Sequence, residues 1–202
     1  MCVIVDEENR VVGAQPRDVT VRNRLLGRGA YVLVFSPPAP APGPAPPPAG
    51  NRPGAAAGGQ QQQQQPPPQQ QQQLLVYKRS SRKDVYPGHW DVVTAGVVRA
   101  GEEYEDTAAR ELAEELGVSE AAAREGLSRL FVFPYKDNIC HVWGAAFTFT
   151  LPAGQQLALQ EEEVDWAGFK SMDEVSELLK TEQFTPVGKH ILHLYHQQRQ
   201  QK

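Results

Sequence analysis

Three glutamates have the residue type and spacing best suited to chemistry in this sequence: Glu111, Glu114 and Glu115. With 3.6 residues per helical turn, this spacing places all three carboxylates on one face of a helix. Like charges at such spacings repel one another, so the face requires a counter-charge. Carboxylate oxygens suit Mg²⁺ or Mn²⁺. From the spacing alone, a cation site and an ordinary solvated acidic face both stay open.

Residues 104–116 (YEDTAARELAEEL) form the strongest helix prediction in the chain. Acidic residues crowd its first turn, strong helix formers fill the middle, and Gly117 follows directly. The apolar residues fall on the face adjacent to the glutamates: Ala109, Leu112 and Leu116. We therefore expect the leucines to lie on a sheet while the glutamates border a cleft. Arg110, beside Glu114 on the helix, offsets only part of the negative charge.

Residues 37–73 have a composition that cannot build a packed core. Pro, Gln, Ala and Gly fill almost all of this segment, and no apolar side chain in it is larger than alanine. Because it buries too little surface to offset its ordering entropy, we predict a disordered loop. Subtracting these 37 residues from 202 leaves 165, which suits one domain. We predict one domain over 1–196, interrupted by this Pro/Gln-rich insert, and a polar tail at 197–202.

Composition also narrows the class of protein. The net charge of −4 and a pI near 5.8 argue against a binder of nucleic acid polymers. Two cysteines cannot form a disulfide scaffold, which favours a reducing compartment. No apolar run approaches the ~20 residues that span a bilayer, and the first residues do not resemble a signal peptide. We therefore expect a cytoplasmic protein with no membrane partner. The sequence gives no indication of oligomeric state.

Strands and helices interleave along the rest of the chain. Residues 16–26 are polar with scattered Val and Leu and give no clear pattern. A capping box at Ser171 predicts a helix through about residue 179, and Thr185-Pro186 begins a last helix. Branched and aromatic residues predict strands at 3–5, 11–12, 30–35, 74–78, 92–93, 130–134 and 141–151. This alternation predicts an α/β domain with a mixed sheet.

The glutamate segment resembles a known motif, the Nudix box, G-x5-E-x7-R-E-U-x-E-E-x-G-U, where U is a bulky aliphatic residue. Every defined position is filled, by Gly96, Glu102, Arg110, Glu111, Leu112, Glu114, Glu115, Gly117 and Val118. The resemblance implies an α/β/α sandwich with a mixed sheet, in which the box forms a loop–helix–loop metal site. It also implies an enzyme that hydrolyses a diphosphate with Mg²⁺ or Mn²⁺.

The same resemblance implies roles for individual residues. The implied metal ligands are Glu111, Glu114, Glu115 and the carbonyl of Gly96. One of these glutamates could instead act as the base or orient the attacking water. Arg110 is implied to fix the carboxylates, and Glu102 to support the loop.

Further candidates each have a plain alternative. Glu163 lies where some Nudix enzymes place another catalytic carboxylate, and a charged turn is the alternative. Arg79, Arg82 and Lys83 are candidate donors to substrate phosphates, or they belong to a solvated turn. Trp90 is a candidate to stack on a base or line the pocket, and packing in the core is the alternative.

Similarity extends beyond the box. LLVYKRS at 74–80 and YPGHWD at 86–91 resemble the Nudix branch related to isopentenyl-diphosphate isomerase. The isomerases carry a catalytic cysteine shortly after the matching tryptophan, whereas DVVTAG at 91–96 has none. We therefore expect hydrolysis of a diphosphate in a nucleoside diphosphate derivative or similar small molecule. The alternative is a catalytically weak Nudix scaffold that acts as an interaction protein through its Gln-rich insert.

Overall fold

A computed structural model describes residues 1–38, 72–159 and 162–201. Most of the predicted disordered loop at 37–73 therefore lies outside the described residues, as does the last residue of the predicted tail. The strands are β1 (Cys2–Val5), β2 (Val11–Gln15), β3 (Gly27–Phe35), β4 (Leu74–Arg79), β5 (Trp90–Asp91), β6 (Thr94–Val97), β7 (Ser128–Lys136), β8 (His141–Thr150) and β9 (Val164–Lys170). The helices are α1 (Arg17–Arg22), α2 (Tyr104–Leu116), α3 (Glu120–Gly126), α4 (Met172–Thr181) and α5 (Pro186–Gln200).

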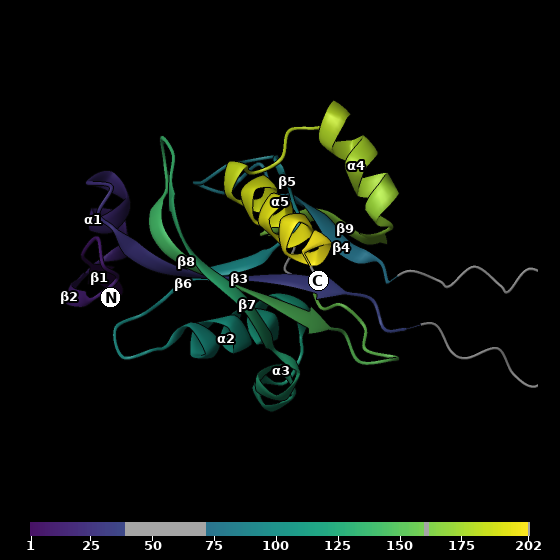
Figure 1. The fold of residues 1–202 in the computed structure, drawn as a ribbon, viewed down its shortest axis with the longest axis horizontal. Helices are drawn as coiled ribbons and strands as arrows, with labels where there is room; N and C mark the ends of the chain where they lie inside the picture. Colours follow the sequence, from purple (N-terminus) through teal and green to yellow (C-terminus); the bar gives the residue numbers. More distant parts are fainter. Residues whose placement is uncertain (39–71, 160–161, 202) are drawn as a thin grey trace, which may run out of the picture.

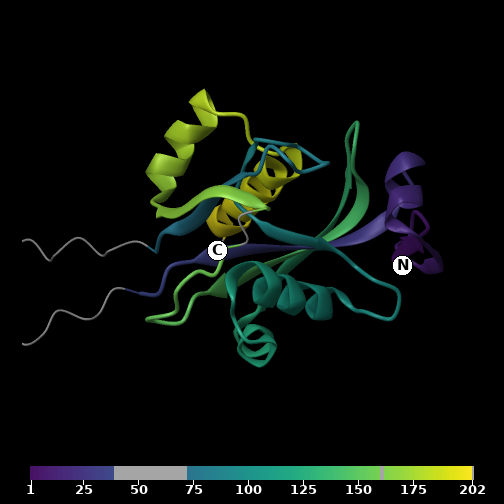
Figure 2. The ribbon, with the colours of Figure 1, turned by 180° about the vertical axis from the view of Figure 1, so that it is seen from behind.

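The elements form three layers. Within the described residues, nine strands join one mixed sheet. Helices α2 and α3 lie on one side of the sheet, and α4 and α5 lie on the other (Figures 1 and 2). This arrangement confirms the predicted α/β/α sandwich. Among the described residues, every helix is too short or too polar to span a bilayer.

Strand β3 is the centre of the fold. It pairs in parallel with β8 over its whole length and antiparallel with β6. Side chains of a strand alternate between the two faces of its sheet, so β3 serves two cores. Ala30, Val32 and Val34 pack in the core that contains α2. Tyr31, Leu33 and Phe35 pack in the core that contains α5. Both cores are continuous with neighbouring strands, which fixes the helices relative to the sheet.

Helix α2 has the bounds that the sequence predicted, and its ends explain why. A capping box closes its start, where the Asp106 carboxylate accepts a hydrogen bond from the Glu103 amide at 2.8 Å. Gly117 ends it in the left-handed conformation, with φ of 71°. Leu112 and Leu116 are buried against the sheet. The predicted division into an apolar face and a glutamate face is confirmed.

Two local predictions were wrong. Residues 92–93 do not form a strand but link β5 to β6, because the Asp91 carboxylate accepts hydrogen bonds from both of their amides, at 2.8 and 3.3 Å. The last helix was expected to give way to a polar tail at 197–202, but α5 continues to Gln200. There, the side-chain Nε2 of Gln198 donates to the carbonyl of Leu130 at 3.4 Å, which ties the last turn to β7.

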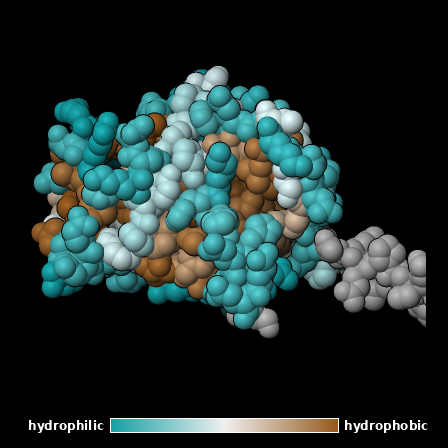
Figure 3. All heavy atoms as spheres, turned by 45° about the horizontal axis from the view of Figure 1, so that its top comes forward, coloured by the Kyte–Doolittle hydropathy of each residue, from teal (hydrophilic) through white to brown (hydrophobic). Residues whose placement is uncertain are grey.

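The surface of the molecule is mixed in polarity. Figure 3 shows hydrophilic side chains over much of one face, with apolar side chains between them. Val11 and Val12 of strand β2 are among the large hydrophobic residues that stay exposed, at 57% and 63%. Strand β2 lies at the edge of the sheet and, among the described residues, pairs with β1.

Candidate active site

The glutamate face of α2 borders a cavity of about 530 Å³. The structure brings most of the predicted site residues to its lining: Gly96, Arg110, Glu111, Glu114, Glu115, Glu163, Arg79 and Lys83. Helix α2 supplies the glutamates, while the adjoining β6 supplies Gly96. The opposite, apolar side of α2 packs against the sheet, so the core holds this carboxylate wall in place.

Arg110 connects the carboxylates of the box. Its guanidinium donates to Glu111 Oε1 at 2.6 Å and to Glu114 Oε2 at 3.1 Å. Its Nε donates to Glu102 Oε1 at 3.2 Å. Charge-assisted, planar contacts of this kind fix both partners in direction as well as distance. One arginine therefore joins the loop before α2 to the helix itself.

Glu102 sits at the other end of that network. Its carboxylate also accepts hydrogen bonds from the Thr107 hydroxyl at 2.7 Å and the Arg99 amide at 3.3 Å. Burial works to raise the pKa of Glu102, but the hydrogen bonds from Thr107 and Arg110 outweigh it and hold the pKa below its usual value. Glu102 is thus a charged anchor for the loop.

Glu115 is in a different electrostatic position. Among the described residues, none forms a hydrogen bond or an ion pair with its carboxylate. Burial, and then the negative charges of Glu111 and Glu163, raise the pKa of Glu115 to about 8. Burial also raises the pKa of Glu111, although Arg110 opposes it. The cavity therefore concentrates carboxylates whose charge the protein itself leaves incompletely balanced.

The glutamate carboxylates and the Gly96 carbonyl have the ligand chemistry of a hard divalent cation, since Mg²⁺ and Mn²⁺ bind carboxylate and carbonyl oxygens. Such an ion would also balance the negative charge of Glu115. Within the described ranges, however, no three His, Cys, Asp or Glu side chains already converge around one point. Arg110 engages Glu111 and Glu114 in this conformation. Arg110 contacts only one oxygen of each carboxylate, so the second oxygens of Glu111 and Glu114 are not used by the guanidinium.

The remaining predicted site residues, outside the box, differ in whether they reach the cavity. Glu163 lies at the cavity and forms an ion pair with Lys83, at 2.8 Å between Oε1 and Nζ. Arg79 reaches the cavity while its guanidinium donates to the Val85 carbonyl at 2.9 and 3.2 Å. Arg82 lines a neighbouring cavity instead.

Trp90 is not brought to either cavity. Its indole Nε1 donates to Glu182 at 2.9 Å, and its ring packs against Trp166 and Phe184. Cation–π contact with Lys78 adds to this packing, at 5.9 Å from the ring centroid. Trp90 therefore packs among other side chains, as the alternative interpretation predicted, and its position does not support a role in substrate binding.

Sequence reasoning missed the opposite wall of the cavity. The segment before and at the start of β3 lines it with arginines: Arg17, Arg24 and Arg28. His141 in β8 holds this segment, with its Nδ1 3.3 Å from the carbonyl oxygen of Arg24. The signal was a set of scattered arginines at 17–28, most of them in the stretch between 16 and 26 that showed no clear pattern, and periodicity alone gave no reason to place it at this cavity.

Comparison with known proteins decides the family. The model of the NUDIX domain matches residues 68–195. An uncharacterized Nudix hydrolase of Pseudomonas aeruginosa is 33% identical over 191 residues, which cover 95% of this chain and 90% of the relative. The chain belongs to the Nudix family. A Nudix hydrolase of Salmonella typhi, YfcD, is 28% identical over 184 residues, covering 91% of this Nudix chain and 77% of the relative.

Solved structures agree on the fold of this Nudix hydrolase. A crystal structure from Deinococcus radiodurans superposes with a TM-score of 0.65 at 17% identity, covering 96% of this chain and 98% of that one. The NUDIX domain of Shewanella oneidensis NrtR, complexed with ADP ribose, superposes with a TM-score of 0.56 at 13% identity, covering 91% and 99%. At these identities the likeness concerns the fold alone.

Membership carries a general activity. Nudix hydrolases are diphosphohydrolases that act on small-molecule substrates, and the family generally uses divalent metals such as Mg²⁺. This Nudix chain is thus an enzyme of that class, and the predictions of an enzyme and of hydrolase chemistry are confirmed.

Proposed function

We propose that this Nudix hydrolase cleaves the diphosphate linkage of a nucleoside diphosphate derivative or similar small molecule, with Mg²⁺ or Mn²⁺ as cofactor. The ligands in this proposal are Glu111, Glu114, Glu115 and the carbonyl of Gly96. The observation that carries it is the buried carboxylate of Glu115, which forms no hydrogen bond or ion pair among the described residues and has a pKa raised to about 8, although Lys83 and Arg79 act to lower it. Such a carboxylate is costly unless it binds a cation.

The remaining residues have roles that follow from their positions. A divalent cation, when bound, neutralises diphosphate charge and lowers the pKa of a coordinated water. Glu163 borders the same cavity, held by Lys83, and is placed to accept a proton from the attacking water. Arg79 and Lys83, with Arg82 beyond them, present cationic donors to the phosphate oxygens. Arg110 orients the carboxylates without touching the substrate.

Hydrolysis is proposed over isomerisation because residues 91–96, where the isomerases place their cysteine, contain none. Cys140 does line the cavity, half-buried, so the comparison has to be made by experiment. Purified protein with Mg²⁺ is incubated with nucleotide sugars, ADP-ribose, dinucleoside polyphosphates, coenzyme A, NAD derivatives and prenyl diphosphates. Product analysis separates cleavage at a diphosphate from a shifted double bond. Isomerised prenyl product without cleavage of any compound would overturn the proposal.

Glu115→Gln tests the metal site directly. Mn²⁺ binding by calorimetry should weaken about tenfold or more in this variant, and turnover should fall by about 10² or more. In the wild type, a carboxyl with a pKa near 8 must lose its proton to bind the ion, so affinity should rise with pH up to about 8, and that rise should flatten in the variant.

Glu125→Gln is the matched control, since Glu125 is an exposed residue of α3 outside both cavities. It should leave metal affinity and turnover unchanged. Equal Mn²⁺ affinity and equal turnover in Glu115→Gln and the wild type would contradict the assignment of Glu115 as a ligand.

A further inference from the structure

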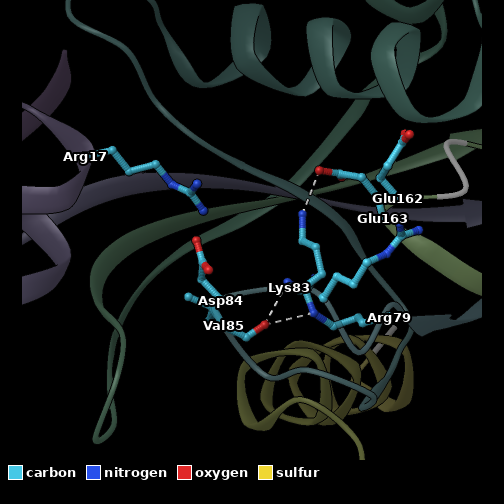
Figure 4. Close-up of a pocket in the computed structure, with 8 residues that line it drawn as sticks. Arg17, Arg79, Lys83, Asp84, Val85, Glu162 and Glu163 are labelled. Atoms are coloured by element: carbon cyan, nitrogen blue, oxygen red, sulfur yellow. Dashed lines mark hydrogen bonds and ion pairs between the residues drawn. The ribbon is translucent and has the colours of Figure 1, made fainter.

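A second cavity, of about 350 Å³, adjoins the carboxylate cavity. The two share part of their lining: Arg17, Arg79, Lys83, Val85 and Glu163. The three glutamates of α2 line only the larger cavity. The ion pair between Lys83 and Glu163, drawn in Figure 4, belongs to both linings. A molecule whose diphosphate faces α2 can therefore extend past this ion pair into a separate compartment.

The smaller cavity is rich in cations. Its charged residues are Arg17, Arg79, Arg82, Lys83, Asp84, Glu162 and Glu163. Of the carboxylates, Glu163 is already neutralised by Lys83 at 2.8 Å. The side chain of Glu162 points away from the centre of the space in Figure 4. The side chains that face the smaller cavity are thus mainly cationic, and the Asp84 carboxylate is its main hydrogen-bond acceptor.

Arg17 has the position of a ligand-binding residue. It comes from α1, on the side of the cavity opposite Lys83, and its guanidinium extends into the space above Asp84 (Figure 4). Within the described residues it has no hydrogen bond or ion pair. Within its helix, the Thr20 hydroxyl donates to the Pro16 carbonyl at 3.0 Å, and the chain just after the helix contacts β8 through the His141 ring, whose Nδ1 lies 3.3 Å from the Arg24 carbonyl oxygen.

Guanidinium groups match phosphate oxygens in pairs, whereas an isolated guanidinium over solvent gains little from a single distant carboxylate. The Asp84 carboxylate, which lies below the Arg17 guanidinium in Figure 4, can accept a hydrogen bond from a hydroxyl group. Together, these two side chains present complementary partners to a sugar that carries a phosphomonoester: the cation for the phosphate, and the carboxylate for a neighbouring hydroxyl.

We propose that this cavity is a second anion subsite, in which Arg17 binds a phosphomonoester on the part of the substrate that is not cleaved. The inference rests on the proposed diphosphate hydrolysis at α2 and adds the substrate class: nucleotides with a phosphate beyond the scissile diphosphate. Arg17 is a specificity-determining residue of this subsite and takes no part in the bond cleavage.

Matched pairs of compounds test the subsite. NADPH differs from NADH, and coenzyme A from dephospho-coenzyme A, by one phosphomonoester on a ribose. The wild type should hydrolyse the phosphorylated member of a pair with kcat/KM about tenfold or more above its partner. Arg17→Gln should lower kcat/KM for the phosphorylated member about fivefold or more, mainly through KM, and leave the other member unchanged.

Arg22→Gln is the control on the same helix. Arg22 pairs with Asp18 at 3.3 Å and lines neither cavity, so its loss should not change the preference. Equal kcat/KM within each pair would overturn the proposal. So would a preference that survives Arg17→Gln, or one lost equally in Arg22→Gln. A fall for both members of a pair would assign Arg17 a general role and also contradict it.

Binding experiments keep the test separate from the proposed function. If no member of either pair is hydrolysed with Mg²⁺ present, diphosphate hydrolysis of such nucleotides fails, and calorimetry on the same compounds decides the subsite alone. Tighter binding of NADPH than NADH in the wild type, lost in Arg17→Gln, supports it, and equal binding overturns it. Inorganic phosphate is titrated as well: Arg17-dependent binding of phosphate alone, without discrimination within the pairs, would identify a free-phosphate site and overturn the proposal.

Discussion

The backbone of Gly96 lies directly against the carboxylate of Glu111. A Cβ atom placed on Gly96 would fall 2.0 Å from Glu111 Oε1 and 2.2 Å from its carboxyl carbon. Strand β6 and helix α2 therefore approach so closely that only glycine leaves room for this side chain. The contact explains in physical terms why a glycine and a glutamate fifteen residues apart belong to one site.

Gly96→Ala tests this contact. The end of a glutamate side chain can move, so the fold should survive with a loss of about 1–2 kcal/mol in unfolding free energy, while the displaced Glu111 should lower turnover about 10-fold or more. Gly13→Ala in β2 is the control, because nothing lies within 4 Å of its added Cβ. Urea unfolding and turnover are measured on both. Full activity in Gly96→Ala would contradict the placement of Glu111.

Arg110→Lys tests the guanidinium network. Lysine keeps the charge but cannot reach Glu102 and Glu111 together, so both carboxylates lose a fixed partner in a site where the arginine side chain is only 12% exposed. We expect a loss of about 2 kcal/mol in unfolding free energy and a fall in kcat. Arg10→Lys, at a pair with a 71% exposed arginine, should change stability by less than about 0.5 kcal/mol. Similar losses in the two variants would argue against the network.

The buried Asp91 predicts a pH dependence of stability. Burial raises its pKa to about 6, although Arg79 and the amides of Val92 and Val93 act in the opposite direction. Between its ordinary pKa of 3.8 and about 6, the folded protein holds a proton that the unfolded chain releases, so the Asp91 contribution favours folding below this window and is lost as pH rises through it. Across this window, Asp91 changes the free energy of unfolding by about 3 kcal/mol. Asp91→Asn should remove that slope.

Chemical unfolding of the wild type and Asp91→Asn at intervals from pH 4 to 7 measures this effect. The two curves should diverge in slope below about pH 6 and run parallel above it. Glu174→Gln serves as the comparison, because hydrogen bonds from the Ser171 amide and Lys170 lower the pKa of that exposed carboxylate instead. An unchanged slope in Asp91→Asn would show that Asp91 does not titrate in this range.

Removal of the Pro/Gln-rich insert separates the enzyme from the interaction-protein alternative. The strands on either side are already joined at the residues next to it, since the Ser36 amide donates to the Gln73 carbonyl at 2.8 Å and Phe35 pairs with Leu74. Replacing residues 39–71 by a short turn should therefore leave Tm no lower than that of the wild type, because closing a shorter loop costs less entropy. The value of kcat/KM should stay within about twofold of the wild type. A large loss of turnover would assign the insert a role in catalysis.

Much of the site was readable because its signals are local. The helical period, the glycine after Leu116 and the box spacing lie within 23 residues, so α2 and its glutamate face were predicted with the bounds that the structure has. Strand β9 was not predicted, because its exposed and buried residues follow no clear alternation and its pairing with the buried β4 over long range stabilises it. Residues 92–93 form a link between β5 and β6 because the Asp91 carboxylate binds their amides, and the apolar pattern that predicted a strand there gives no sign of this contact.

The sequence by itself determined the family, the helix that carries the carboxylates and the general chemistry, because each depends on residue types at fixed short separations. Only the tertiary structure decided what stands opposite that helix. Contacts between distant segments place Arg17 at the second cavity, leave Trp90 among other aromatic rings, and bury Glu115 without a hydrogen-bond or ion-pair partner among the described residues. Burial and electrostatics arise between segments distant in sequence, and no local pattern encodes them.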